Sequence, residues 1–226
     1  MTRFTLDDTG TAVDVTVREL IVAGWAGREQ AGIDEHIEEL RALGVKPPSS
    51  TPLFYRVSAD LLTQAGRIQV LGNESSGEVE VVLIGTDQGT LVAIGSDHTD
   101  REAEAWSVAH SKQVCAKPVS QAAWWLDDVI DHWDQLTLAS DALIDGQEQA
   151  YQRGGVTGLL HPRDLLARFG LDEPRLAPGV AMLCGTLPVI SGHVRPAEAL
   201  TVSLIDPVRN RRLSHRYEID TLPVVS

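Results

Sequence analysis

The sequence lacks the features that would place it in several large classes of protein. Only two cysteines are present, Cys115 and Cys184, without the spacing of a metal site, and we interpret both as reduced, packed thiols. No apolar run approaches the roughly 20 residues that a membrane-spanning helix needs. The N-terminus has neither the basic start nor the apolar core of a secretory signal, so we expect a cytoplasmic protein.

Basic residues are also scarce. The chain has 19 Lys and Arg residues against 32 Asp and Glu residues, a formal net charge of −13. Because nucleic-acid affinity comes mostly from neutralising phosphates, this balance argues against a nucleic-acid partner. The one basic stretch, residues 209–212, is short and predicts a hairpin turn. An acidic protein instead favours the capture of cations.

Length and composition predict one domain. A chain of 226 residues that is 43% hydrophobic can bury a substantial core. The sequence contains no internal repeat and no low-complexity tract. We therefore expect a single domain over residues 1–226, in which residues 1–50 supply N-terminal strands and a helix that could act as a lid.

The most informative stretch lies between residues 75 and 112. Residues 78–85 and 90–95 are apolar and rich in β-branched side chains, while residues 86–89 have turn chemistry. This pattern predicts a β-hairpin. With a four-residue turn, Glu78 faces Asp97 and Glu80 faces Gly95, so three carboxylates converge at one end of the hairpin.

Three carboxylates on one face repel each other unless something neutralises them. A divalent cation is the simplest candidate, because Glu78, Glu80 and Asp97 offer only hard oxygen ligands. This ligand set favours Mg²⁺, Mn²⁺ or Ca²⁺ over Zn²⁺. The alternative is that the hairpin has a different register and the same residues form a solvated acidic edge.

The remaining elements follow from periodicity, caps and turn residues. Helical spacing and cap signals predict helices over residues 33–43, 100–106, 121–138, 141–152 and 162–169. Apolar and alternating runs predict strands within residues 13–23, 52–57, 67–71, 180–186, 200–205 and 213–219.

Several polar residues on these elements could take part in chemistry. His36 and Glu39 are neighbours on the first helix, where the carboxylate could orient the imidazole, although this spacing is also typical of an exposed ion pair. Arg101 could bind a substrate carboxylate or pair with a neighbouring acid. Lys112, if it lies near a metal, would present a positive charge to an anionic intermediate.

Short motifs occur in a characteristic order along the chain. They are His36-x-x-Glu39, Glu78-x-Glu80, Asp97 with Arg101 four residues later, Lys112, and Gly185-Thr186. This order resembles the fumarylacetoacetate hydrolase superfamily, with its H-x-x-E, E-x-E, N-D-x-[ST]-x-R-D, following lysine and late G-T-P. The similarity spans roughly residues 22–219.

The resemblance implies a fold, a metal and a reaction. The fold would be α+β and mostly β, a mixed β-roll or sandwich with peripheral helices, in a protein that forms a homodimer. The metal would be Mg²⁺, or else Mn²⁺ or Ca²⁺, held by Glu78, Glu80 and Asp97. The reaction would be carbon–carbon bond hydrolysis of a small 2-oxo or 1,3-dicarbonyl acid through an enolate.

The resemblance also implies roles for single residues. The catalytic group would include a base, the carboxylate that orients it, and a lysine that stabilises the enolate: His36, Glu39 and Lys112. Three residues would lie on the substrate side: Arg101, Glu104 and Thr186.

The chain departs from the family pattern at several positions. The tyrosine expected ahead of His36 is missing, His98 stands at an ordinarily apolar position, and Glu104 replaces a glutamine. The late motif, Gly185-Thr186-Leu187-Pro188, is one residue longer. Two kinds of alternative stay open: decarboxylation, isomerisation or hydration on the same scaffold, and a non-catalytic member that binds a metal or a small anion.

Overall fold

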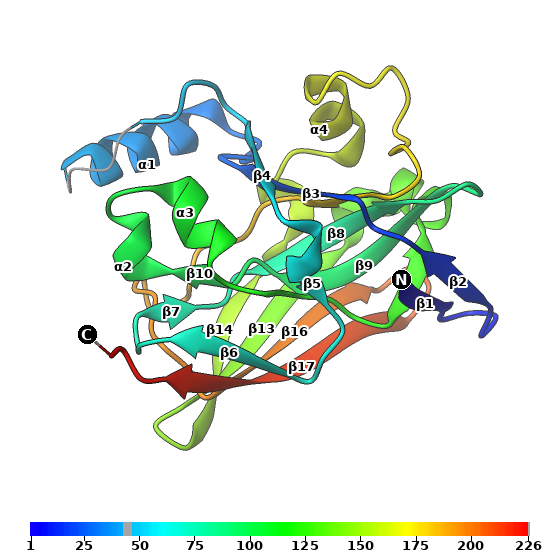
Figure 1. The fold of residues 1–226 in the computed structure, drawn as a ribbon. Helices are drawn as coiled ribbons and strands as arrows, with labels where there is room; N and C mark the ends of the chain where they lie inside the picture. The colour runs from blue at the N-terminus through cyan, green and yellow to red at the C-terminus, as the bar shows by residue number, and fades with distance from the viewer. Residues whose placement is uncertain (43–46, 226) are drawn as a thin grey trace.

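Strands are the most abundant secondary-structure elements of the molecule (Figure 1). The computed structural model describes residues 1–42 and 47–225, and the side chains of residues 35, 36, 39, 40 and 42 lie outside the description. The strands are β1 (Thr2–Leu6), β2 (Ala12–Val15), β3 (Glu19–Gly24), β4 (Leu53–Val57), β5 (Leu62–Thr63), β6 (Arg67–Leu71), β7 (Ser75–Ser76), β8 (Val79–Gly85), β9 (Thr90–Ser96), β10 (Thr99–Asp100), β11 (Lys117–Pro118), β12 (Ala122–Trp125), β13 (Thr137–Ile144), β14 (Gln147–Gly155), β15 (Val180–Leu183), β16 (Ala199–Asp206) and β17 (Arg211–Leu222). The α-helices are α1 (Gln30–Ala42), α2 (Arg101–Glu104), α3 (Val108–Gln113) and α4 (Pro162–Arg168).

These strands form two large sheets. One has the order β2-β1-β12-β9-β8-β15-β3-β4, and the other has the order β14-β13-β16-β17-β6. Two short pairs, β10 with β7 and β11 with β5, lie beside them. The helices lie outside the sheets, with α2 and α3 next to β10 and β7 (Figure 1). This arrangement confirms the expected mostly-β fold with peripheral helices.

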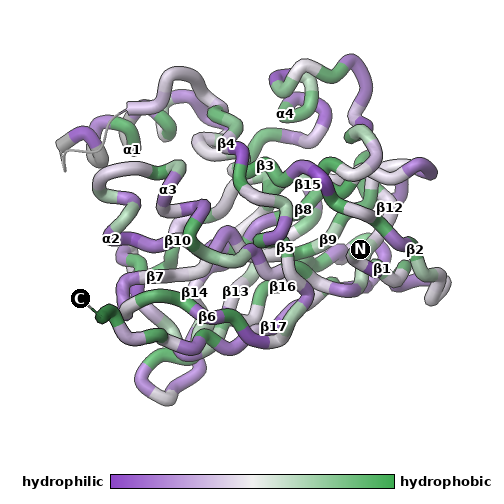
Figure 2. The backbone as a smooth tube through the Cα atoms, viewed as in Figure 1, coloured by the Kyte–Doolittle hydropathy of each residue, from purple (hydrophilic) through white to green (hydrophobic). Residues whose placement is uncertain are grey.

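The hairpin of β8 and β9 is the central layer. Its strands are buried along their whole length, and Figure 2 shows hydrophobic stretches along both. Val81 and Leu83 face the core shared with the five-stranded sheet, whereas Val82 and Ile84 face a second core with β1 to β3. Because successive side chains alternate between faces, burial on both sides explains why this hairpin is almost continuously apolar.

The predicted register of this hairpin is confirmed. Gly85 pairs with Thr90, and Glu80 pairs with Gly95. The pairing continues past the strand ends, where the Asp97 amide donates to the Glu78 carbonyl at 3.0 Å. Residues 86–89 form the turn, in which the Thr86 amide donates to the Gly89 carbonyl at 2.8 Å. The sequence thus places both strands correctly relative to each other.

The predicted packing helix over residues 121–138 is wrong. Residues 122–125 form β12, which pairs with both β1 and β9, and residues 126–135 form short 3₁₀ turns. Trp124, Trp133 and Leu136 are buried as expected, but on an extended and then tightly turned backbone. Sheet pairing with β9 overrides the helical spacing of these side chains.

The predicted polar helix over residues 141–152 is also wrong. This segment belongs to the hairpin of β13 and β14, which are paired across a two-residue turn. Asp145 and Gly146 in the turn have φ values of 52° and 71°. An Asp-Gly pair with positive φ at both positions is a typical hairpin turn, and this signal outweighs the polar composition of the segment.

The other predicted elements are found close to their expected bounds. The predicted helix over residues 162–169 is α4, and the last predicted strand pair is β16 with β17, joined by a turn that contains Arg209. The predicted helix over residues 33–43 is α1, apart from Leu43, which lies outside the described residues. The helix expected from residue 100 is shorter than predicted: Asp100 caps it, and it ends at Glu104. Within the described residues, no helix has the length and apolarity required to cross a bilayer.

Candidate metal centre

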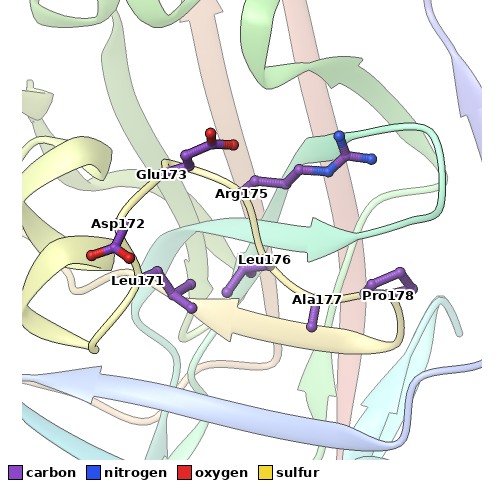
Figure 3. A pocket seen from close by; sticks show the side chains of 7 residues that line it. All are labelled: Leu171, Asp172, Glu173, Arg175, Leu176, Ala177 and Pro178. Atoms are coloured by element: carbon purple, nitrogen blue, oxygen red, sulfur yellow. The ribbon is translucent and has the colours of Figure 1, made fainter.

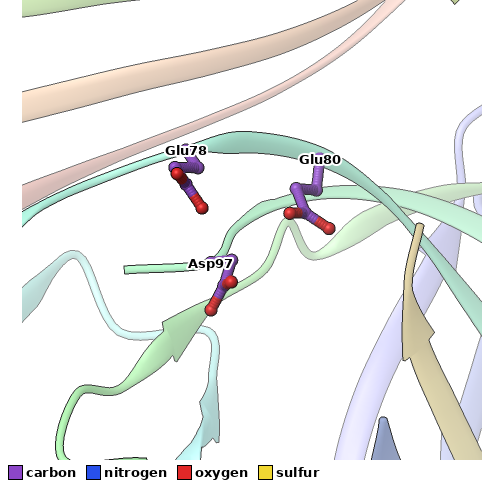
Figure 4. A group of neighbouring side chains, drawn as sticks. All are labelled: Glu78, Glu80 and Asp97. Atoms are coloured by element: carbon purple, nitrogen blue, oxygen red, sulfur yellow. The ribbon is translucent and has the colours of Figure 1, made fainter. Parts of the chain in front are cut away.

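Three carboxylates meet at the open end of the central hairpin. One carboxylate oxygen each from Glu78, Glu80 and Asp97 lies within 4.8 Å of the others. Figure 4 shows Glu78 and Glu80 projecting from one strand segment toward Asp97 on the next. Glu80 and Asp97 are buried, and Glu78 is partly exposed. A solvated acidic edge would leave all three exposed, so the geometry favours the metal interpretation.

Glu80 is the most isolated of these acids. The amide of Gly185 donates to its Oε2 at 2.8 Å. Burial, together with the charge of Asp97, raises the pKa of Glu80 well above its ordinary value. Among the described residues, no Lys or Arg nitrogen lies within 4.0 Å of its carboxylate. Glu80 therefore has no direct ion-pair partner among the described residues.

Two buried lysines approach Asp97. Lys112 Nζ donates to Asp97 Oδ2 and lies 3.9 Å from Glu78 Oε2. Lys117 Nζ lies 3.2 Å from Asp97 Oδ1 and donates to the backbone carbonyls of His98 and Cys115 at 2.6 and 3.0 Å. Lys112 is the predicted residue, and Lys117 is the second lysine of the same segment, to which the sequence assigned no role. Only its closeness to Lys112 in the chain hints at it.

The charges in this cluster shift each other's pKa values. Burial opposes the ionised form of Asp97, but Lys112 and Lys117 overcome it and hold the pKa of Asp97 below its ordinary value. Burial likewise opposes the charge of Lys112, but Asp97, Glu78 and Glu80 raise its pKa. For Lys117 burial dominates, and its pKa is lowered. Lys112 therefore remains a cation next to the carboxylates.

Arg101 forms two hydrogen bonds and one further ion-pair contact through its guanidinium group, and the Nη2 atom in that contact has no aligned hydrogen bond among the described residues. Its Nε donates to Ser76 Oγ at 2.7 Å, Nη1 donates to Glu104 Oε2 at 2.8 Å, and Nη2 lies 2.9 Å from Glu78 Oε1. Although burial opposes its charge, Glu78 and Glu104 raise the pKa of Arg101. Arg101 and Glu104 are thus attached to the carboxylate cluster through Glu78.

The late Gly185-Thr186 motif also reaches the cluster. Gly185 has a φ of 97°, a conformation that favours glycine, and this turns its amide toward Glu80. Thr186 Oγ1 donates to the Val79 carbonyl at 2.9 Å, and it accepts from Gln152 at 2.9 Å. Thr186 is therefore held against Val79 of β8, the residue that separates Glu78 from Glu80.

His36 and Glu39 belong to α1, as the sequence predicts. Their side chains lie outside the described part of the structure. The proposed base and its orienting carboxylate stay a prediction.

A buried histidine lies behind the cluster, where sequence reasoning assigned no role. His98 has no exposed surface. Burial, followed by the charges of Lys117 and Arg101, lowers the pKa of His98 to about 3. Its ring contacts Tyr217, another buried residue that sequence reasoning missed. The unusual histidine next to Asp97 was the only available signal.

A shallow hollow lies at the other end of the hairpin (Figure 3). It is lined by residues 171–173 and 175–178. Arg175 donates to the carbonyl of Asp87, which lies in the hairpin turn. None of the lining residues belongs to the carboxylate cluster.

The cluster fits a hard divalent ion. Its donors are carboxylate oxygens, which Mg²⁺ and Ca²⁺ prefer in proteins. Glu80 has no direct ion-pair partner, and Asp97 Oδ1 is buried without an aligned hydrogen bond, among the described residues. An ion held by Glu78, Glu80 and Asp97 would satisfy both acids.

Known structures share this fold. A yeast protein, ynq8, of the fumarylacetoacetate hydrolase family has a TM-score of 0.62 and 18% identity, with 93% of this chain and 96% of that chain covered. A 2-keto-3-deoxy-D-arabinonate dehydratase complexed with magnesium and 2,5-dioxopentanoate has a TM-score of 0.64 and 10% identity, with 92% and 75% covered. The 4-oxalocrotonate decarboxylase from Pseudomonas putida G7, complexed with magnesium and adipate, has a TM-score of 0.52 and 12% identity, with 92% and 78% covered.

These likenesses establish the fold, which is that of the fumarylacetoacetate hydrolase family, as the motif order predicts. The family model described as "Protein of unknown function (DUF2848)" matches residues 23–217. Because this match covers most of the chain, the chain belongs to that family. No curated protein matches the sequence.

Proposed function

We propose that this chain is a divalent-metal-dependent enzyme that hydrolyses a carbon–carbon bond in a small 2-oxo or 1,3-dicarbonyl acid. The observation that carries the proposal is the convergence of Glu78, Glu80 and Asp97, with Glu80 buried and without a direct ion-pair partner among the described residues. Mg²⁺ is the first candidate ion, with Mn²⁺ and Ca²⁺ as alternatives. Neighbours of the same fold support this choice, because two are described with magnesium and one with calcium.

In this proposal the ion, when bound, supplies Lewis-acid polarisation of substrate oxygens. Lys112 keeps its charge beside Asp97, so its ammonium group can stabilise negative charge that develops on an enolate oxygen. His36, oriented by Glu39, accepts a proton from the attacking water. Burial of the cluster strengthens each of these electrostatic interactions by lowering the local dielectric.

The substrate side of the proposed site contains Arg101, Glu104 and Thr186. The side chains of Arg101 and Glu104 are 17% and 28% exposed, so solvent and ligands reach their ion pair. A substrate carboxylate could replace Glu104 at Arg101 Nη1, since the two groups have the same charge and shape. Thr186 would then border the substrate from the β15 side. A homodimer and a small carboxylate ligand remain part of the proposal.

One alternative within the same scaffold is a lyase. Two neighbours of this fold are described as a dehydratase and a decarboxylase. A second alternative is a non-catalytic protein. The ion pairs of Asp97 with Lys112 and Lys117 favour it, because they already neutralise part of the acidic cluster.

Turnover of two probe acids tests the proposal. Acetylpyruvate reports carbon–carbon hydrolysis and oxaloacetate reports decarboxylation, each followed by the loss of ultraviolet absorbance with Mg²⁺ or with EDTA. We expect turnover of acetylpyruvate that requires Mg²⁺ and is lost in His36→Ala but kept in His193→Ala, a change at an exposed histidine. Turnover of oxaloacetate alone would favour the lyase, and a chain that binds Mg²⁺ but turns over neither acid would favour the non-catalytic alternative.

A further inference from the structure

A row of buried polar side chains lies behind the carboxylate cluster. Ser75, Ser96, His98 and Tyr217 have 4%, 0%, 0% and 0% exposure. His98 Nε2 lies 3.0 Å from Ser75 Oγ, His98 Nδ1 lies 3.1 Å from Tyr217 Oη, and Tyr217 Oη lies 2.9 Å from Ser96 Oγ. The row joins β7, the segment after β9, and β17 of the five-stranded sheet.

The hydrogen bonds in this row have one consistent direction. Tyr217 has a single hydroxyl proton, which it donates to Ser96 Oγ. The His98 Nδ1 atom must therefore carry the proton that Tyr217 Oη accepts. In a neutral imidazole the other nitrogen is then an acceptor, so Nε2 accepts from Ser75. The geometry thus selects the Nδ1-protonated tautomer of His98.

Both ends of His98 connect to the predicted metal ligands. On the ring side, Tyr217 links His98 to Ser96, and Ser96 Oγ accepts from the Glu78 amide at 3.1 Å. The Glu78 carbonyl in turn accepts from the Asp97 amide at 3.0 Å. On the backbone side, the His98 carbonyl accepts from Lys117 Nζ, the atom that lies 3.2 Å from Asp97 Oδ1. The side chain of His98 is therefore connected to Glu78, and its backbone carbonyl is connected to Asp97.

We propose that His98 and Tyr217 are positioning residues that hold the backbone of Glu78 and Asp97 in place for ion binding. The part of this proposal that concerns ion binding rests on the proposed function. The part that concerns the positioning of the two carboxylates is independent of it. Residues one layer behind metal ligands orient those ligands, and their loss typically weakens metal affinity by 10- to 100-fold. Here the row also ties the hairpin to the five-stranded sheet, through Tyr217 on β17.

The backbone of Gly77 packs closely against the row. A Cβ atom added to Gly77 would lie 2.4 Å from Tyr217 Oη and 2.8 Å from Ser96 Oγ. These distances are far below normal contact, so the backbone of residue 77 presses directly against both hydroxyl groups. Close packing of this kind favours one orientation of the tyrosine over any other.

Metal affinity of two matched variants tests the proposal. Tyr217→Phe removes the central hydroxyl of the row. Tyr151→Phe removes another hydroxyl from a buried tyrosine in the same sheet, which bonds instead to Arg195, away from the carboxylates. In Mn²⁺ titrations followed by calorimetry, we expect Tyr217→Phe to weaken binding at least tenfold and Tyr151→Phe to change it less than twofold. Equal affinity in wild type and Tyr217→Phe, or equal weakening in both variants, would overturn the proposal.

Two measurements without metal make the test independent of the proposed function. In the ¹⁵N NMR spectrum of the wild-type imidazoles, we expect His98 to be protonated at Nδ1; protonation at Nε2 would overturn the proposal. Exchange of the Glu78 amide hydrogen should be faster in Tyr217→Phe than in Tyr151→Phe; equal rates would overturn it. If the wild type binds no Mn²⁺, the proposed metal enzyme is wrong, while these two measurements still decide the positioning role.

Discussion

Two hairpins of this molecule carry a buried aspartate at a strand end, and the two aspartates differ in how they are satisfied. Asp97 follows β9, Asp206 ends β16, and neither side chain has any exposed surface. Asp206 accepts from the amides of Val208 and Arg209, from Arg211 Nε at 3.0 Å, and lies 3.1 Å from His132 Nε2. Its partners come largely from its own turn.

Asp97 has a different environment. It lies within 4.8 Å of Glu78 and Glu80, and its cations, Lys112 and Lys117, come from α3 and β11. Burial opposes the charge of both aspartates, and neighbouring cations and donors lower both pKa values. Burial and a low pKa therefore do not distinguish a functional acid from a structural one. What distinguishes Asp97 is that two other carboxylates lie beside it, one of which, Glu80, has no direct ion-pair partner among the described residues.

Removing each aspartate should separate the two roles most clearly. Asp97→Ala leaves Lys112 and Lys117 buried without their main partner, so we expect a loss of about 3–5 kcal/mol in the free energy of unfolding. Asp206→Ala breaks hydrogen bonds of a turn, and Arg211 keeps its contact with Trp124, so we expect a loss of about 1–3 kcal/mol. Urea denaturation of both variants measures the difference, and equal losses would contradict the distinction.

Metal should stabilise only the site that contains Asp97. At 100 times its dissociation constant, an ion that binds the native state adds about 2.7 kcal/mol, which raises the melting temperature by several degrees. We expect this rise with Mg²⁺ or Mn²⁺, and its reversal by EDTA, in wild type and in Asp206→Ala. Asp97→Ala should show no rise. Differential scanning fluorimetry tests this expectation, and a rise in Asp97→Ala would remove it from the ligand set.

Gly77→Ala should show how tightly the end of the hairpin is packed. The added methyl group would meet Tyr217 and Leu200, so we expect a loss of about 1–3 kcal/mol from overpacking. Gly32→Ala on α1 is the matched control, because its methyl group would enter open space. Since alanine favours helices over glycine, this control should gain up to about 1 kcal/mol. Thermal melts of both variants compare them, and a neutral Gly77→Ala would show that the hairpin end can relax.

Glu80→Gln should have the smallest effect, with the opposite sign. In metal-free protein the pKa of Glu80 is higher in the folded state than in the unfolded chain. As the pH rises above 4.5, the Glu80 carboxyl group therefore ionises first in the unfolded chain. The free energy of unfolding falls until the carboxyl group of the folded protein ionises as well. Removing this charge should stabilise metal-free protein by about 1 kcal/mol at neutral pH. It should also flatten the fall with pH and abolish the response to Mg²⁺. Urea midpoints at pH 4 to 8 measure this, and a less stable variant would contradict it.

The sequence predicted the hairpin and its carboxylates because both depend on local geometry. Alternating side chains and a four-residue turn are enough to place Glu78 opposite Asp97 and Glu80 opposite Gly95. The helices predicted over residues 121–138 and 141–152 failed for a different reason. Their spacing fits a helix locally, but pairing with neighbouring strands decides the backbone, and in the second segment the Asp145-Gly146 turn favours a hairpin.

Local spacing along the chain is enough to predict the order of motifs, the register of one hairpin and the three acids at its end. The groups that surround these acids depend on how distant segments pack together. Lys117 lies on β11 and approaches Asp97 from there. His98 and Ser96 contact Tyr217, which lies 119 residues after His98 and 121 residues after Ser96. Side-chain alternation acts over a few residues, whereas such contacts arise only when two sheets pack against each other.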